Sequence, residues 1–187
     1  SSFATQVDDL AVQRIANDRF IRPINVFHDD DNDVRICFCI LFTNAQAGLP
    51  ANFKIATPYD VMWEQSYLLC RSDGQAIGFP PAGLPDPQID YSCLVPAAGY
   101  DLAHEHARQC SKFGLNIFEL ASRPIPGAWR LSLTSTDFGN LLADIVLARW
   151  LIIQLAAKQN WTVNYKSQPF AHYKRYQECK WVIRADK

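Results

Sequence analysis

The side chains with the most chemical potential at short range are His104, His106 and Cys110. In a helix, residues i and i+4 share one face, so His106 and Cys110 could bind zinc together through nitrogen and sulfur. A structural zinc site needs four such ligands, and the sequence offers no evident fourth one. We therefore predict that this segment binds no metal.

A run of acidic residues, Asp29, Asp31 and Asp33, begins like a calcium-binding loop. Such a loop needs glycine at its sixth position and glutamate at its twelfth, whereas this chain has Val34 and Ile40 there. The run is therefore predicted to be a solvated acidic turn. The sequence also has no Ser–His–Asp constellation, P-loop or dinucleotide-binding glycine pattern.

The composition suits one globular domain, because 49% of the 187 residues are hydrophobic and 20% are charged. A formal net charge of −1 argues against nucleic acid as a partner, since proteins that bind phosphate backbones carry a basic excess. The most apolar stretch, residues 141–157, contains Asp144, Arg149 and Gln154. It is therefore predicted to be a core helix and no membrane span.

The cysteines contain no CxxC pair, which indicates reduced and mostly buried thiols in a non-secretory compartment. Cys37 and Cys39 alternate along a predicted strand, which points both thiols to one face. The six residues are Cys37, Cys39, Cys70, Cys93, Cys110 and Cys179.

Hydrophobic periodicity predicts an α+β fold, in which a mostly antiparallel sheet packs against two long helices. One helix spans residues 100–113 and stops at Gly114, and the other follows a cap at Asp137 or Asn140 and runs to residue 159. We also expect a short helix around residues 8–17, a break at Thr57–Pro58, and an irregular loop over 74–91. The predicted strands are 22–27, 35–43, 61–70, 115–120, 129–134, 161–165 and 179–184.

Four segments form an ordered set of landmarks along the chain: Trp63–Leu69, Gly78–Cys93, Pro126–Trp129 and Ala148–Trp150. Their residues and spacing resemble the catalytic domain of eukaryotic-type glutamine synthetases. The first is similar to that family's Ile-Glu-Gln-Glu-Tyr-Thr-Leu strand, and the second to its glycine- and proline-rich loop. The others match Pro-Gly-Gln-Trp and the Ala-Arg-Tyr of the next helix. The resemblance implies a partial catalytic-domain-like fold, with His106 and Cys110 in an ordinary core helix.

The resemblance also implies a site in which carboxylates hold two divalent cations, and this chain departs from it at three of four positions. Glu64 stands at the first carboxylate of the strand, but Ser66 stands at the second, and Arg123 and Arg130 replace two glutamates. These changes raise the charge of the site by five units. An arginine ~4 Å from a divalent cation would repel it by roughly 8 kcal/mol at an effective dielectric near 20. We therefore predict a vestigial site without metal or cofactor, in a chain that is not an enzyme.

Two interpretations of the introduced arginines stay open. Arg123 and Arg130 together could form a pocket for phosphate or carboxylate, because two guanidinium groups make a fork of donors. Alternatively, they pair with Glu64 or Glu119, or face a partner protein. We favour this second interpretation.

Three regions are expected from the extent of the resemblance. Residues 1–19 are predicted to be an N-terminal extension, 20–170 a truncated glutamine synthetase-like domain, and 171–187 a basic C-terminal tail. The family's N-terminal β-grasp domain and its later metal and substrate ligands have no counterpart in the chain.

The leading hypothesis is a non-catalytic, structural accessory subunit of a large mitochondrial assembly, with a respiratory-chain complex favoured. The opening Ser-Ser-Phe-Ala-Thr fits the start left by cleavage of a mitochondrial presequence, and we expect a place on the matrix side of the inner membrane, held through partners, or otherwise in the cytoplasm. The expected partners are other protein subunits, without nucleic acid, a direct membrane span or a small-molecule ligand. The alternatives are a regulatory protein that binds an anion or nucleotide, and a residual ligase completed by a partner chain.

Overall fold

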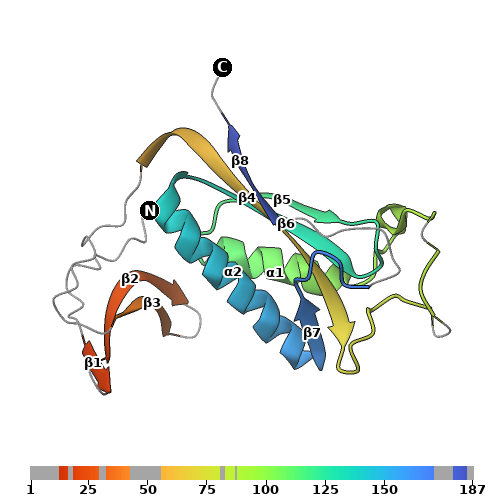
Figure 1. Ribbon diagram of the computed structural model, residues 1–187, viewed down its shortest axis with the longest axis horizontal. Helices are drawn as coiled ribbons and strands as arrows, with labels where there is room; N and C mark the ends of the chain where they lie inside the picture. Colours follow the sequence, from red (N-terminus) through yellow and green to blue (C-terminus); the bar gives the residue numbers. More distant parts are fainter. Residues whose placement is uncertain are drawn as a thin grey trace.

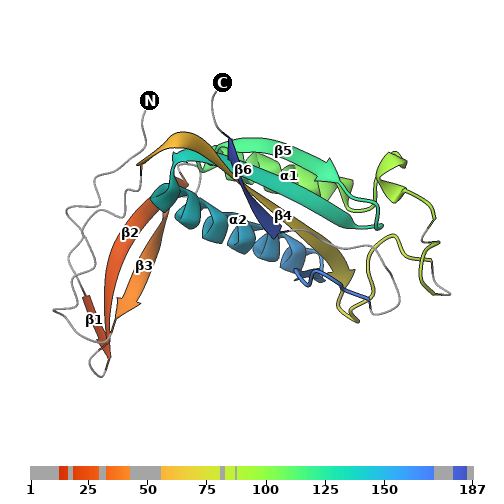
Figure 2. The same cartoon turned by 45° about the horizontal axis from the view of Figure 1, so that its top comes forward.

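The computed structural model describes residues 13–16, 19–29, 33–42, 56–80, 83–86, 88–170 and 179–184. The first of its two sheets has three antiparallel strands in the order β1–β2–β3. It lies at one end of the molecule, next to the beginning of α2 (Figure 2). The bounds of its strands are β1 Gln13–Ala16, β2 Arg19–Asp29 and β3 Val34–Phe42.

The second sheet is built around β4, a strand of 16 residues that pairs along both of its edges. On one edge β6 pairs with β4, and β5 extends the sheet beyond β6. On the other edge β8 pairs with Asp60–Gln65 of β4, and β7 pairs with Leu68–Arg71. All these pairings are antiparallel. The bounds are β4 Ala56–Arg71, β5 Ile117–Ser122, β6 Ala128–Asp137, β7 Trp161–Asn164 and β8 Cys179–Arg184.

Two helices, α1 Tyr100–Lys112 and α2 Phe138–Lys158, lie side by side on one face of the second sheet (Figure 1). Alternate residues of β4 point toward them, because successive side chains of a strand face opposite sides. The helices and the sheet enclose one core, whose members are less than a tenth exposed. They include Val61, Trp63, Tyr67, Leu69, Ala103, Cys110, Leu131, Leu133, Leu141, Leu147, Ala148 and Ile152.

Short-range signals explain where the helices begin and end. Gly114, with φ of 81°, takes the left-handed conformation directly after the first helix, which glycine adopts without a steric penalty. Asp137 caps the second helix: its Oδ1 accepts hydrogen bonds from the backbone N–H of Gly139 at 3.0 Å and of Asn140 at 3.4 Å. The cap at Asp137 is one of the two that the sequence predicted.

The predicted α+β class is confirmed: antiparallel sheets pack with two long helices. All seven predicted strands are present, with ends that differ by a few residues. The apolar segment Gly139–Lys158 of α2 is long and apolar enough to cross a membrane by length and composition alone. Its inner side is nevertheless buried against the sheet and α1, as in a core helix.

Three expectations from the sequence are wrong. The break at Thr57–Pro58 does not occur, because β4 begins at Ala56 and a register shift before Val61 accommodates the proline. Gln13–Ala16 forms β1 and no helix, since it pairs with β2, and residues 8–12 and 17 lie outside the described ranges. The thiols are less buried than predicted, because three of the five described are exposed: Cys37, Cys39 and Cys93.

The acidic turn and the domain boundaries are described only in part. Asp29 ends β2, and Asp33 follows in a left-handed turn with φ of 50°, while Asp31 lies outside the described residues. The expected boundaries after residues 19 and 170 stay predictions.

Candidate functional site

The predicted site lies on the face of the second sheet opposite the two helices. Within β4, Trp63 and Tyr67 belong to the core beneath the helices, so Glu64 and Ser66 point to the other face. Glu64 lies directly across from Ser132 of β6, and Ser66 lies directly across from Arg130. Residues opposite each other in an antiparallel pair point their side chains to the same face. The sheet register therefore brings three of the four predicted residues together.

Arg130 lies between two carboxylates. Its Nη1 is 3.5 Å from Oε2 of Glu64, and its Nη2 donates a hydrogen bond of 2.5 Å to Oε2 of Glu119 on β5. The side chain of Glu64 is 9% exposed and that of Arg130 is 17% exposed, whereas Glu119 is 40% exposed. The predicted pairing with Glu64 or Glu119 is confirmed for Arg130, which binds both.

Two buried hydroxyl groups lie beside this ion triad of Glu64, Arg130 and Glu119. Ser66 and Ser132 are fully buried, and neither Oγ has a hydrogen-bond partner among the residues that the structure describes. A buried hydroxyl without a partner costs about 1–3 kcal/mol, so the interior of this face is polar at a cost to stability. The sequence did not predict Ser132, and its place opposite Glu64 in the register is the signal that identifies it.

Arg123 follows the end of β5 and is hydrogen-bonded through its backbone N–H to the carbonyl of Ala128 at 2.9 Å. It borders a cavity of about 210 Å³ at the glycine- and proline-rich loop, which Ser122, Tyr91 and Pro126 also line. Arg130 is not among the residues that line this cavity. The two arginines therefore have different surroundings, and whether an anion binds near them stays a prediction.

The donor set does not fit the two divalent cations that the resemblance implies. Among the four predicted positions only Glu64 carries a carboxylate, and the guanidinium of Arg130 lies 3.5 Å from it. Within the described ranges, no group of three or more His, Cys, Asp or Glu side chains is placed to hold a metal ion. Hard divalent cations need several oxygen ligands, which this arrangement does not bring together.

The residues of the zinc interpretation do not share one environment, because His106 and Cys110 are buried and His104 is exposed. His106 is buried: Tyr67 Oη lies 3.3 Å from its Nδ1, and its Nε2 lies 2.9 Å from the carbonyl oxygen of Ala148. A carbonyl only accepts, so Nε2–H donates to Ala148 and Nδ1 accepts from Tyr67. Burial lowers the pKa of His106 to about 4, against a smaller opposite effect of the Ala148 bond. His104 instead is exposed and stacks on Tyr100, with ring centroids 4.0 Å apart.

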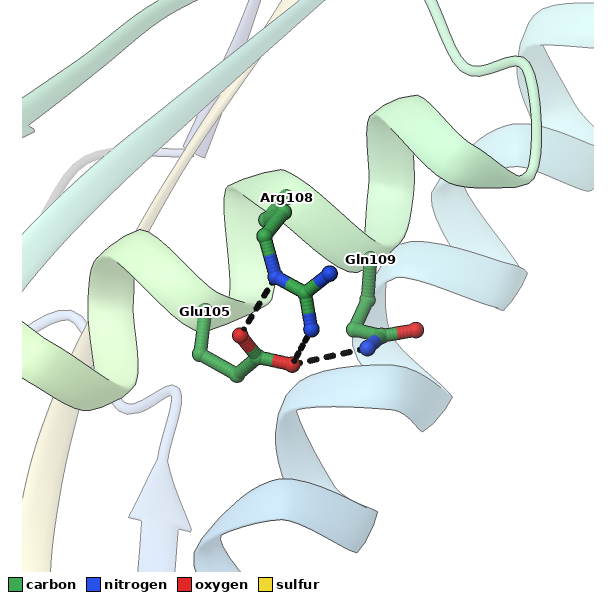
Figure 3. Close-up of polar contacts among 3 residues, drawn as sticks. All are labelled: Glu105, Arg108 and Gln109. Atoms are coloured by element: carbon green, nitrogen blue, oxygen red, sulfur yellow. Dashed lines mark hydrogen bonds and ion pairs between the residues drawn. The ribbon is translucent and has the colours of Figure 1, made fainter. Parts of the chain in front are cut away.

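Two further polar groupings support the elements and were not predicted from the sequence. Arg149 of α2 donates to Oε1 of Gln65, and its guanidinium lies 5.5 Å from the Trp63 ring centroid. On α1, Arg108 donates two hydrogen bonds of 2.7 Å to Glu105, and Gln109 donates a third of 2.7 Å (Figure 3). These contacts join neighbouring turns of the helix and lower the pKa of Glu105.

Comparison with known proteins gives a consistent result, although no family model matches the chain. The chain is 25% identical to a probable glutamine synthetase of Caenorhabditis elegans over 169 residues, which is 82% of this chain and 46% of that protein. It is 26% identical to a glutamine synthetase of Hebeloma cylindrosporum over 168 residues, which is 82% of this chain and 47% of that protein. A glutamine synthetase of Suillus bovinus matches at 28% identity, over 83% of this chain and 48% of that protein.

Two solved structures share the fold. The structure described as "Apo GmaS without ligand" superposes with a TM-score of 0.67 at 15% identity, covering 98% of this chain and 46% of that one. The Plasmodium falciparum glutamine synthetase superposes with a TM-score of 0.61 at 11% identity, covering 98% of this chain and 44% of that one. The chain is glutamine synthetase-like. The predicted resemblance is thereby confirmed, and the chain spans about half the length of the curated relatives it matches.

This finding corrects one prediction. The glutamine synthetase-like chain was predicted not to be an enzyme, whereas its curated relatives carry the name of an enzyme. The prediction relied on Ser66, Arg123 and Arg130, and on family segments without a counterpart in this sequence. The composition of one part of a site does not decide catalysis in a chain that spans about half of its relatives.

Proposed function

We propose that this glutamine synthetase-like chain works as an accessory subunit of a larger protein assembly and binds its partners through apolar surface. The observation that carries the proposal is a row of exposed apolar side chains along α2, which we call the α2 stripe. Val146, Trp150 and Ile153 are 50%, 42% and 45% exposed. Their spacing of four and three residues places them on one side of the helix.

A second apolar region supports the proposal. In the loop before α1, Ile89, Leu94 and Val95 are 45%, 52% and 95% exposed. Single exposed apolar residues are normal in monomers, but groups of them are typical of surfaces that bind other proteins. Chains of an assembly would bury such groups.

For location, the proposal is the matrix side of the mitochondrial inner membrane, within a respiratory-chain complex. The support is the sequence: the formal net charge of −1 is unlike that of proteins bound to ribosomal RNA, which favours a respiratory-chain complex over a ribosome. Fractionation of cells that express the tagged chain tests this location. Recovery of the chain outside mitochondria would contradict it.

Native separation of the source extract, followed by identification of co-migrating proteins, tests the main proposal. We expect the chain in a particle far larger than its own mass of 21.2 kDa. Migration of all of it as a free chain of 21.2 kDa would refute the proposal.

A second candidate is a ligase whose site a partner chain completes. It is favoured by the names of the curated relatives and by Glu64, which keeps a carboxylate in the resembling strand. Arg130 would have to release Glu64 in that complex. An assay for γ-glutamyl hydroxamate on the purified complex, with magnesium or manganese, tests this candidate. Activity that disappears in Glu64→Gln but persists in Glu119→Gln would support it, and absence of activity in the intact complex would dismiss it.

A further inference from the structure

The outer strand of the first sheet exposes two thiols side by side. In β3, Ile36 and Phe38 pack against the core beside Phe27, whereas Cys37 and Cys39 are exposed on the opposite face. Cysteine is among the residues most often fully buried, so two exposed thiols on one face of a strand are unusual for a structural role. Both are free thiols.

Their spacing suits a shared metal ion better than a disulfide. Residues i and i+2 of an antiparallel strand lie about 6.8 Å apart at Cα, at the upper limit of about 6.8 Å for a disulfide. A disulfide holds its sulfurs ~2.05 Å apart, whereas sulfurs bound to one metal at ~2.3 Å each can lie up to roughly 4.6 Å apart. The Sγ of Cys39 is 3.9 Å from the carbonyl oxygen of Cys37, so its side chain leans toward Cys37.

The two thiols would bind the ion as thiolates. Metal binding requires deprotonated thiols, so the ion would displace their protons.

We propose that Cys37 and Cys39 form a binding site for a soft monovalent ion, Cu(I), held by two thiolates. Thiolate ligands select Cu(I) and zinc over hard cations. Structural zinc sites take four ligands, and the described residues provide no group of three. Cu(I), by contrast, forms stable complexes with two thiolate ligands. Two thiols lose two protons to water, two copper–sulfur bonds form, and the oxidation state of copper does not change.

Titration of the reduced full chain with Cu(I), without oxygen and against a competing chelator, tests the proposal. We expect one Cu(I) per chain and a sulfur-only coordination of two ligands by X-ray absorption. Cys37→Ser and Cys39→Ser should each weaken binding by about 100-fold or more, since loss of even an outer-shell partner costs about 10–100-fold. Cys93→Ser is the matched control, because Cys93 is exposed but has no neighbouring cysteine in the strand pattern.

Three results would overturn the proposal: unchanged affinity in Cys37→Ser, equal loss in Cys93→Ser, or one ion per two chains with four sulfurs. Because both positions are exposed, the serine variants should keep their far-ultraviolet circular dichroism and unfold within about 0.5 kcal/mol of the parent. Lost binding in a folded variant therefore reports on the thiol itself.

Discussion

At the scale of single residues, Arg130 decides the character of the polar face. It places one positive charge between Glu64 and Glu119, so the ion triad carries a net charge of −1. Burying a carboxylate is costly unless a cation and hydrogen bonds compensate it. Glu64 is nearly buried, and Arg130 is the cation 3.5 Å from its carboxylate, whereas the side chain of Glu119 is 40% exposed.

Replacement of Arg130 by methionine should therefore destabilise the fold by about 3 kcal/mol, because it leaves the Glu64 carboxylate buried without its cation. Urea unfolding at pH 7 measures this change. Glu119→Gln is the control and should cost less than about 1 kcal/mol, as is usual for a solvent-exposed ion pair. Equal and small effects of the two variants would show that Glu64 does not need the guanidinium.

His106 supplies a second prediction at this scale, which concerns pH. Its pKa is about 4 in the fold and 6.5 as the ordinary value, so the unfolded chain binds the proton more readily. The contribution of His106 to the free energy of unfolding is therefore complete above pH 6.5. It falls as the pH decreases from 6.5 to 4 and does not change below pH 4. The loss is roughly 3 kcal/mol.

Urea unfolding at pH 7 and pH 4 measures this loss. In His106→Gln the part of the pH dependence due to this residue should disappear, even though the variant is less stable at pH 7. An identical difference between the two pH values in variant and parent would contradict the assigned role of His106.

At the scale of elements, α2 combines a buried side with an acidic residue close to it. Asp144 lies in the second turn of α2, and burial, followed by the charge of the capping Asp137, raises its pKa to about 7. A carboxyl with a raised pKa favours folding only while it is protonated. The contribution of Asp144 to stability is complete below pH 3.8. It is lost as the pH rises from 3.8 to about 7 and does not change above that.

Asp144→Asn should therefore raise the free energy of unfolding by about 4 kcal/mol at pH 8 and by much less at pH 4. Thermal unfolding at the two pH values checks the difference. Asp101→Asn, in the exposed first turn of α1, is the matched control for removing a carboxylate from a helix. A variant that is equally stabilised at both pH values would point to a cause other than ionisation of Asp144.

Local signals predicted the elements well and their partners poorly. Alternation along residues 61–70 identified β4, and Asp137 and Gly114 marked helix ends, because these features depend on neighbours in sequence. The pairing of β8 with β4, across more than a hundred residues, carries no local signal. Likewise, alternation placed Cys37 and Cys39 on one face, but only packing of Phe38 decides that this face is outside.

The same limit applies to the site. The resemblance identified Glu64, Ser66, Arg123 and Arg130, and the register then joined Glu64, Ser66 and Arg130. Glu119 was one of two candidate partners for the arginines, and the structure shows that Arg130 binds both. Ser132 could not be predicted, because serine in a strand has no distinguishing pattern until its opposite residue is known.

At the scale of the whole molecule, the exposed apolar surfaces lie on two separate parts of the fold. The α2 stripe runs along the outer side of a helix, and the second region belongs to the loop that precedes α1. A subunit with two such regions could contact two partners, or one partner that reaches both. Either arrangement buries surface that a free chain leaves in water.

Replacement of Val146, Trp150 and Ile153 together by glutamine should release the chain from the proposed assembly, because it removes the apolar side chains of the α2 stripe. Native separation should shift the variant toward the mass of the free chain. The single variant Gln154→Ala, at an exposed position of the same helix, should stay in the assembly. If the triple variant stayed as well, the α2 stripe would not be the binding surface.

The place of β8 has a consequence for the order of events during synthesis. Ribosomes make the chain from its N-terminus, so β4, both helices and β7 emerge before Cys179–Arg184. Until residue 184 has emerged, one edge of β4 between Asp60 and Gln65 offers unpaired backbone groups to any extended polypeptide nearby. Closure of the nascent sheet is therefore a late event, and a competing strand has its opportunity before β8 arrives.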